Sequence, residues 1–426
     1  MKKFFKFLGV VLFVLIGALI ILYFVKNEPL PEGEQGKSAD ALAMKMLNAL
    51  NHEAYKNTET ITWNFRNNHF YKWNKKDDIV VISWDQNKVI LHTKNSIKTT
   101  VFMNDEKVEN AAVLKKAIDF YNNDSFWLVA PYKVFDSGAE RRLVNYEGKK
   151  ALLITYTFGG STPGDSYLWI LDENYLPTSF KMWINIIPIG GLAATWSDWK
   201  NTESGIKLPT KHTLSLFGLE ITLGNVKAVN EKANILAKRI LKAIHHDAYK
   251  NTRFLEWSFG GKRFFKWDKE DNIVDVSWDT IRVNLHTTNL KNSTVFFNNK
   301  EQKTPDTTRV KKAWNIFNND SFWLVAPHKL FEKGIVRSIK KVNGNETLLV
   351  KYTTGGSTPG DSYLWNLDAT DIPTSYNMFV PSLNMDGVLA TWEGWKKTES
   401  GTLLPTNHTF SSGNELSMGT VKAYNK

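Results

Sequence analysis

Two kinds of residue in this chain have types and spacing that suggest catalysis, and each kind occurs twice. The triplet Gly164–Ser166 (Gly-Asp-Ser) recurs at Gly360–Ser362 and can present a nucleophilic serine. That chemistry needs a base histidine held by an acid, and no Asp-x-x-His occurs in the carboxyl-terminal part of either copy. We therefore interpret the triplet as a Gly/Pro turn capped by Asp165, and a hydrolase that uses it is the third hypothesis.

Histidines are the second kind. His92 and His286 fall at matching strand positions, on the more polar face of each strand. A metal or general-base role needs converging partners, and no i,i+4 pair or short ligand cluster links the available residues, which are Asp85, Asp124, Asp165, Glu203 and His212. These histidines, together with His212 and His408, are interpreted as surface or hydrogen-bonded strand residues. The sequence predicts no metal site, no cofactor and no catalytic residue.

Tryptophan is the remaining candidate for function, with 16 residues. Several positions occur in both copies and favour either an apolar cavity that holds acyl chains or a packed core between sheet and helices. The ten predicted ligand-binding positions are Trp63, Trp73, Trp84, Trp127, Trp169, Trp257, Trp267, Trp278, Trp323 and Trp365. Lys133 and Lys329 are the predicted contacts to an anionic headgroup, or else solvated side chains.

Composition limits the function classes. The chain has 426 residues, 42% hydrophobic and 23% charged, which suits two or three globular domains. Its net charge of +11 is spread along the chain, so we predict no nucleic-acid partner. The absence of cysteine excludes disulfides, thiolate metal sites and cysteine nucleophiles.

An internal repeat organises the chain. NNDSFWLVAP occurs at 122–131 and 318–327, and GGSTPGDSYLW occurs at 159–169 and 355–365. A period near 195 residues is too long for a solenoid, so it indicates a duplicated globular domain, 37–229 and 230–426.

Each copy predicts the same element order. In the first copy, helical stripes cover Ser38–Tyr55 and Ala111–Tyr121, with short alternating strands between and after them. Two long strands are expected at Ala193–Lys200 and Lys207–Phe217, joined by a turn at Ser204-Gly205. The NNDSFWLVAP segment is interpreted as a helix exit that plugs one end of the barrel, or as a ligand gate or lid contact. The predicted class is α+β with one large antiparallel sheet.

The amino terminus predicts a membrane anchor. Residues 7–25 form an uncharged run of 19 residues, about 28 Å long as a helix. Lysines in the preceding tail, 1–6, favour a cytoplasmic amino terminus and place the rest of the chain across the membrane. A cleaved signal peptide is the alternative, but no A-x-A pattern follows the run. Residues 26–36 read as an extended linker.

The element order and short motifs resemble the LolA/LolB-like lipoprotein carriers of the Gram-negative periplasm. The residues that carry the resemblance are Leu168–Asp172 followed by Tyr175–Thr178, then Trp196–Trp199 with Gly205–Pro209, and their second-copy counterparts. The resemblance implies, for each copy, an incomplete antiparallel barrel lidded by helices. It departs from the carriers in being tandem and tethered by a helix.

The prediction is therefore a single-pass protein of the inner membrane with two half-barrel domains facing the periplasm. Its expected function is non-catalytic binding of a lipid, an acyl chain or a lipidated protein. The alternative is a structural or scaffolding envelope protein without a ligand.

Overall fold

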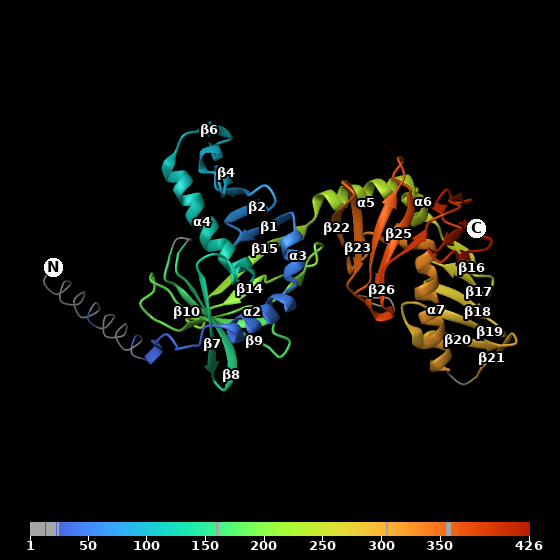
Figure 1. Ribbon diagram of the computed structural model, residues 1–426, viewed down its shortest axis with the longest axis horizontal. Helices are drawn as coiled ribbons and strands as arrows, with labels where there is room; N and C mark the ends of the chain where they lie inside the picture. Colours follow the sequence, from blue (N-terminus) through green and yellow to red (C-terminus); the bar gives the residue numbers. More distant parts are fainter. Residues whose placement is uncertain (1–12, 14–22, 24, 159–161, 304–305, 355–358) are drawn as a thin grey trace, which may run out of the picture. The chain divides into compact units, whose positions relative to one another are not determined.

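A computed structural model describes residues 13, 23, 25–158, 162–303, 306–354 and 359–426 (Figure 1). The chain divides into two compact units, Met1–Val229 and Asn230–Lys426, here the first and the second unit. Most of the predicted membrane segment, 7–25, lies outside the described residues. Among the residues that are described, no helix is both long enough and apolar enough to cross a membrane.

The first helix of each unit is broken in two. In the first unit, α2 (Lys37–Ala49) is followed by α3 (His52–Asn57). The helix predicted over Ser38–Tyr55 is interrupted because Asn51 adopts the left-handed conformation, with φ of 62°. The Asn51 side-chain amide donates to the Gly205 carbonyl over 2.7 Å. In the second unit His245 makes the same break, between α5 (Glu231–Ala243) and α6 (His246–Asn251).

The long helix of each unit extends past its predicted end. α4 (Ala111–Val129) continues eight residues beyond Tyr121, and α7 (Thr307–Val325) is its counterpart. The NNDSFWLVAP segment is therefore mainly helix and not a helix exit. Its polar residues have low helix propensity, but burial of Leu128 and Val129 outweighs that preference. The short helices η2 (Ala130–Lys133) and η4 (Ala326–Lys329) follow.

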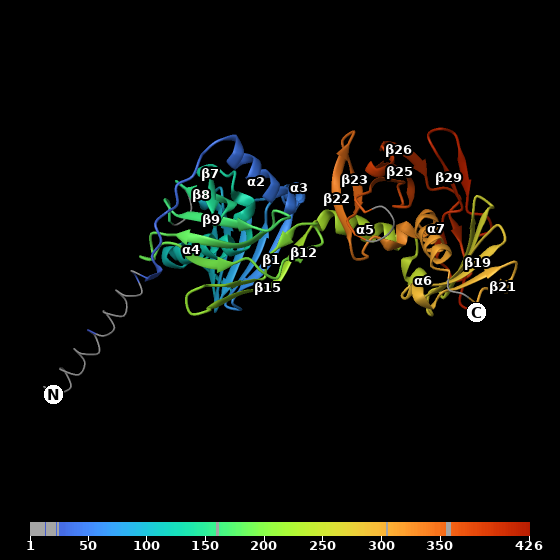
Figure 2. The ribbon, with the colours of Figure 1, turned by 90° about the horizontal axis from the view of Figure 1, so that it is seen from below.

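The first unit contains two large antiparallel sheets. Their orders are β14-β15-β1-β2-β3-β4-β5-β6 and β11-β10-β9-β8-β7, and β12-β13 is a separate hairpin. β15 returns from the end of the unit to pair with β1 (Figure 2). The strand bounds are β1 (Thr60–Phe65), β2 (His69–Asn74), β3 (Ile79–Trp84), β4 (Asn87–His92), β5 (Thr100–Met103), β6 (Glu106–Val108), β7 (Ala139–Tyr146), β8 (Lys149–Tyr156), β9 (Ser166–Leu171), β10 (Pro177–Trp183), β11 (Leu192–Thr195), β12 (Lys200–Asn201), β13 (Lys207–Leu208), β14 (Lys211–Thr213) and β15 (Glu220–Val229).

The second unit repeats this plan with one break. Its sheets have the orders β21-β20-β19-β18-β17-β16-β31 and β22-β23-β24-β25-β26, with hairpins β27-β28 and β29-β30. The counterpart of β15 is divided at Gly419, where φ is +61°. The strand bounds are β16 (Phe254–Phe259), β17 (Arg263–Asp268), β18 (Ile273–Trp278), β19 (Ile281–His286), β20 (Thr294–Phe297), β21 (Lys300–Glu301), β22 (Ile335–Val342), β23 (Asn345–Tyr352), β24 (Ser362–Leu367), β25 (Pro373–Val380), β26 (Met385–Thr391), β27 (Lys396–Lys397), β28 (Leu403–Leu404), β29 (Asn407–Thr409), β30 (Glu415–Ser417) and β31 (Lys422–Tyr424).

The α+β class and the curved antiparallel sheets agree with the prediction, but the single large sheet is divided. Isolated bridges, Ala194 with Leu214 and Ser197 with Lys211, are the links between β11 and the β14 region. The two long strands predicted over 193–217 become four short ones, because Asp198 has φ of 54° and Pro209 has no N–H to donate. No closed barrel forms among the described residues, and β6 and β7 end their sheets.

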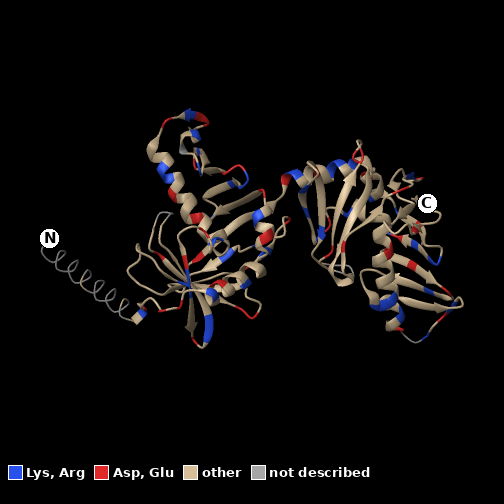
Figure 3. Ribbon diagram, in the orientation of Figure 1, with Lys and Arg blue, Asp and Glu red and all other residues tan. Residues whose placement is uncertain are grey.

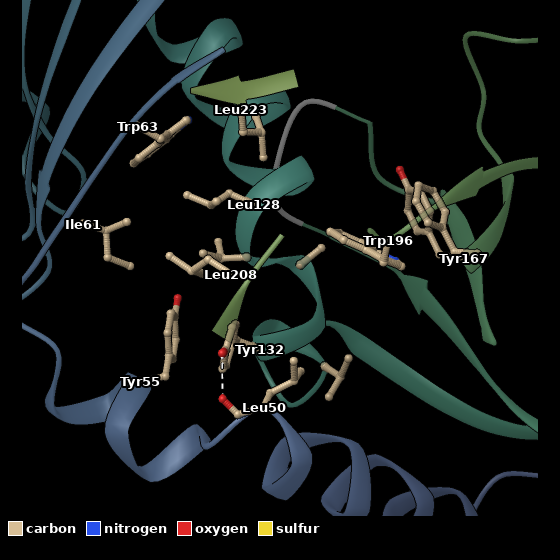
Figure 4. Packing of buried hydrophobic residues seen from close by; sticks show 14 of the residues in the cluster. Leu50, Tyr55, Ile61, Trp63, Leu128, Tyr132, Tyr167, Trp196, Leu208 and Leu223 are labelled. Carbon is tan, nitrogen blue, oxygen red and sulfur yellow. Dashed lines mark hydrogen bonds between the residues drawn. The ribbon is translucent and has the colours of Figure 1, made fainter. Parts of the chain in front are cut away.

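The carboxyl-terminal part of α4 packs in the hydrophobic core of the first unit. α2 packs against β7 and β8, and its buried stripe joins a core that also contains residues of both sheets. Figure 4 shows Leu128 of α4 near Trp63, Leu208 and Leu223. At the end of α4, the Tyr132 hydroxyl donates to the Leu50 carbonyl over 2.8 Å. In the second unit the buried apolar residues form two clusters, one under each sheet.

Replacing Leu128 by alanine should lower the free energy of unfolding of the first unit by about 2–5 kcal/mol, because it leaves a cavity in a fully packed site. The same change at Leu324, equally buried on α7, should destabilise the second unit by a similar amount. Urea unfolding followed by circular dichroism measures both. Leu114→Ala, at a half-buried position of α4, is the control and should cost less. Equal losses at positions 114 and 128 would contradict the core assignment.

Candidate functional site

The interior around α4 is the candidate site of the first unit, because this helix contacts both sheets through aromatic side chains. Toward the eight-stranded sheet, the Phe120 ring lies 5.4 Å from Trp84, centroid to centroid. Toward the five-stranded sheet, the Phe126 ring lies 4.4 Å from Tyr167. Edge and tilted arrangements at these distances are favourable aromatic contacts. A single helix therefore connects the apolar surfaces of two sheets.

α7 makes the corresponding contacts in the second unit. The Phe317 ring lies 5.2 Å from Trp267 of the seven-stranded sheet. The Phe322 ring lies 4.6 Å from Tyr363 of the five-stranded sheet. The helix between two sheets is thus present in both copies.

Neither helix is completely covered by its sheets. α4 carries a set of large apolar side chains that are only half-buried although they contact the core: Leu114, Ile118, Phe120, Tyr121, Phe126 and Trp127. On α7 the half-buried apolar residues include Trp314, Ile316, Phe322 and Trp323. Apolar surface therefore continues from the core to the outside of each unit along these helices.

The predicted tryptophans follow one pattern in both units. The fully buried ones are Trp63, Trp84, Trp169, Trp257, Trp278 and Trp365, whereas Trp73, Trp127, Trp267 and Trp323 are half-buried. Their neighbours are other core rings; Trp63, for example, stacks on Tyr71 with centroids 4.4 Å apart. Of the ten, Trp257 lines a pocket, which is described below. A ligand role for these residues stays a prediction.

Several polar atoms inside this apolar interior have no hydrogen-bond partner within the described part of the chain. They fall at equivalent positions of the two units: the hydroxyls of Tyr156 and Tyr352, Nε1 of Trp63 and Trp257, Nε1 of Trp169 and Trp365, Nε1 of Trp196 and Trp392, and Nε2 of His212 and His408. An unpaired buried polar group is costly, so its recurrence in both copies is informative. The interior offers hydrogen-bonding groups as well as apolar surface.

The two histidines of that set are neutral. His212 is fully buried, and its Nδ1–H donates to the Thr195 carbonyl over 2.8 Å. Burial lowers its pKa to about 4, and it lowers the pKa of His408 to about 4 in the same way. The His212 ring lies 4.7 Å from Trp196 and 5.2 Å from Trp127. These histidines are hydrogen-bonded strand residues and do not lie on the surface.

A buried carboxylate on α4 was not identified as a site from the sequence. Asp124 is 1% exposed and accepts from the Tyr71 hydroxyl at 2.5 Å and lies 2.7 Å from His69 Nδ1. Contact with this carboxylate and burial raise the pKa of Tyr71, burial being the larger cause. The sequence offered one indication of this site, the identical Asn-Asn-Asp-Ser segment in both copies. That segment does not show that the acid points inward.

The second unit holds its equivalent acid differently. Asp320 is fully buried, and its Oδ1 accepts from Arg263 at 3.0 Å. Arg263 takes the place of His69, and Phe265 takes the place of Tyr71. Burial raises the pKa of Asp320 to about 6, against the opposing effects of Asn319 and Arg263. Each long helix is thus tied to its larger sheet by one buried carboxylate.

The remaining predicted residues have partners of their own. Lys133 and Lys329 form ion pairs with Asp136 (2.8 Å) and Glu332 (3.6 Å), so their headgroup role stays a prediction. Asp165 accepts from the Asn185 backbone N–H at 2.9 Å, a contact between segments 20 residues apart, and its role as a turn cap stays a prediction. Ser166 is buried, with Oγ 2.9 Å from Thr155 Oγ1.

Histidines and acids do not gather into a metal site. His92 and His286 are half-buried and pair across their sheets with Ile79 and Ile273. In the described part of the chain, no group of three or more histidine, aspartate or glutamate residues is placed to hold a metal ion.

Because His212 is buried, the stability of the first unit is sensitive to acid. Because the pKa of His212 falls from 6.5 to about 4 on folding, the unfolded chain binds the proton first, and stability is lost as the pH falls from 6.5 toward 4. At pH 5 we expect a penalty of about 2 kcal/mol. His212→Asn, which keeps an N–H donor but does not titrate, should reduce the loss of unfolding free energy between pH 7 and pH 5 by that amount. A variant with the full wild-type loss would refute this assignment.

Comparison with known proteins identifies no family. No protein-family profile matches the chain, and no curated protein matches it. Among solved structures, the chain is similar to a DUF1329 family protein from Desulfovibrio piger, with 11% identity and a TM-score of 0.28 over 45% of this chain and 94% of that one. It is also similar to a putative outer membrane lipoprotein-sorting protein domain from Vibrio parahaemolyticus, with 11% identity and a TM-score of 0.24 over 44% and 93% of the two chains.

Proposed function

We propose that this protein is a membrane-anchored, non-catalytic binder of a lipid, an acyl chain or a lipidated protein. The observation that carries the proposal is the half-covered apolar surface of α4 and α7 between two sheets. An acyl chain that replaces solvent on this surface gains about 0.8 kcal/mol for each buried CH₂ group. The unpaired indole, hydroxyl and imidazole groups in the same interior supply hydrogen bonds for a polar end of the ligand.

Opening requires movement of the long helix, and its two ends differ in how they are held. At the carboxyl end of α4, the Tyr132 hydroxyl contacts the carbonyls of Leu50 and Lys207 at 2.8 and 2.6 Å. At the amino end, Ala111 and Ala112 are exposed. We infer that α4 pivots at Tyr132 and that release of Asp124 from β2 accompanies the movement. In the second unit His328 replaces Tyr132, with Nε2 2.9 Å from the Leu403 carbonyl.

The location of the protein is part of the proposal. The apolar run 7–25 anchors the chain in the inner membrane with its amino terminus in the cytoplasm, and both units face the periplasm. In this arrangement the units act close to the membrane that supplies the ligand.

A second candidate is a structural or scaffolding role. The observation that favours it is the complete burial of Trp169 and Trp365, whose contacts are with other core aromatics. If all the interior is filled by such packing, the units need no ligand.

Tryptophan fluorescence distinguishes the two functions because the first 62 residues contain no tryptophan. The full chain in lipid nanodiscs is titrated with dibromostearic acid, and with stearic acid as the unquenching control. Binding in the interior should quench the fluorescence saturably. Trp127→Phe together with Trp323→Phe should remove a large part of the quenching, because both rings lie on the half-covered helices.

Trp183→Phe is the matched control. Trp183 packs in a separate small cluster with Val144, Ala151 and Leu168, and its indole N–H donates to the Glu28 carbonyl. Its replacement should leave the quenching unchanged. If the full chain shows no quenching, or if Trp183 accounts for it, the binding proposal fails and the scaffolding role is favoured.

A further inference from the structure

A pocket of about 740 Å³ lies on the seven-stranded sheet of the second unit. It opens on the face opposite α7. On β16, Glu256 and Ser258 line the pocket and alternate with Leu255 and Trp257. Trp257 also borders the pocket, but it is 3% exposed and its ring stacks on Phe265 in the core. Side chains alternate between the two faces of a strand, so this site is separate from the interior described above. Figure 3 shows charged residues of both signs on the strands of this sheet.

Three cations from three strands surround the pocket: Lys266 of β17, Arg282 of β19 and Lys422 of β31. The lysine side chains are each 57% exposed. The hydroxyls of Ser258, Ser277 and Thr420 add further donors to the lining.

The two acids of the pocket are already engaged by the chain. Glu256 accepts from the Tyr424 hydroxyl at 2.5 Å and from Lys422 at 3.3 Å, and these contacts hold its pKa below the usual range. Asp275 Oδ1 accepts from Arg282 and from Asn284, each at 3.0 Å. Each ammonium has three donors and the guanidinium five, so the pocket has more donors than its own acids use. The acids orient the cations, and the surplus donors suit an anionic ligand.

An exposed aromatic ring completes the pocket. Phe264 is 54% exposed, and its cross-strand neighbours are Ser258 and Ser277. These small side chains leave the ring accessible.

The volume of the pocket lies within the usual range for small-molecule sites and exceeds the size of a bare ion. The lining therefore suits a ligand that combines an anionic group with an apolar part.

The first unit has no acid at the two positions equivalent to Glu256 and Asp275. Its equivalent cations are all lysines, Lys72, Lys88 and Lys227, whereas Thr62 and Val81 stand in place of Glu256 and Asp275. Asn64 replaces Ser258, so an amide stands where the second unit has a hydroxyl. The same sheet face thus differs in chemistry between the two copies.

We propose that the pocket of the second unit binds a phosphate-bearing ligand, with Lys266 and Arg282 on the phosphate, Lys422 at the far edge of the pocket and Phe264 against the apolar part of the ligand. Arginine and lysine together suit the three oxygens of a phosphate, because the guanidinium donates two parallel hydrogen bonds and the ammonium acts as a point charge. The proposal does not depend on lipid binding in the interior.

Calorimetry on the full chain in a nonionic detergent and phosphate-free buffer tests the proposal. One arm uses sn-glycerol 3-phosphate, and the other uses mixed micelles of phosphatidylglycerol, with phosphatidylcholine as the comparison. The variant K266Q/R282Q should bind at least tenfold more weakly than the wild type. The control K72Q/K88Q makes the same charge change on the equivalent face of the first unit and should bind within twofold of the wild type.

The outcomes separate the sources of the phosphate. Binding of glycerol phosphate that K266Q/R282Q loses supports a soluble ligand, and binding of phosphatidylglycerol alone, lost in the same variant, supports a lipid headgroup. Glu256→Gln removes a negative charge and keeps an acceptor for Tyr424, so binding should be equal or tighter. Absence of binding in both arms, equal loss in K72Q/K88Q, or loss in Glu256→Gln overturns the proposal.

Discussion

Each unit depends on one long helix that packs between two curved antiparallel sheets, which do not close on each other. β6 and β7 end their sheets, so backbone pairing cannot seal the interior of the first unit. α4 connects these two strands along the chain and places Leu128 and Val129 in the core. Because the helix contacts two sheets, it is apolar on more than one side, and some of its aromatic side chains remain half-exposed. The exposed apolar surface that suggests binding is a consequence of this construction.

The same constraint explains the polar groups inside each unit. A helix that must stay in place over an incomplete sheet gains orientation from a buried carboxylate, since a misplaced acid would lose its hydrogen bonds. Asp124 contacts Tyr71 and His69, whereas Asp320 accepts from Arg263 at Oδ1 and is ion-paired with it. The acid occupies the same position in both copies. Its partners are a tyrosine hydroxyl and an imidazole in the first unit and a guanidinium in the second.

The two units share a framework and differ at their surfaces. Both units break their first helix with a left-handed residue, and both bury a neutral histidine beside two tryptophans. The outer face of the larger sheet has diverged, with Thr62 and Val81 in the first unit against Glu256 and Asp275 in the second. Side chains at these positions point away from the core, so they can be replaced without loss of packing. The charged groups of this face therefore differ between the two units.

The sequence by itself determined the repeat, the α+β class and the position of most strands, because period-2 alternation and helical stripes are local signals. The residues after Tyr121 were misassigned because burial of Leu128 outweighed the local propensity of the polar segment before it. Tertiary structure alone decided that Asp124 points inward, that the predicted single sheet divides between β11 and β14, and that Lys266, Arg282 and Lys422 surround one pocket. Each of these depends on how segments far apart in the chain pack and pair, and no local pattern of residues encodes that arrangement.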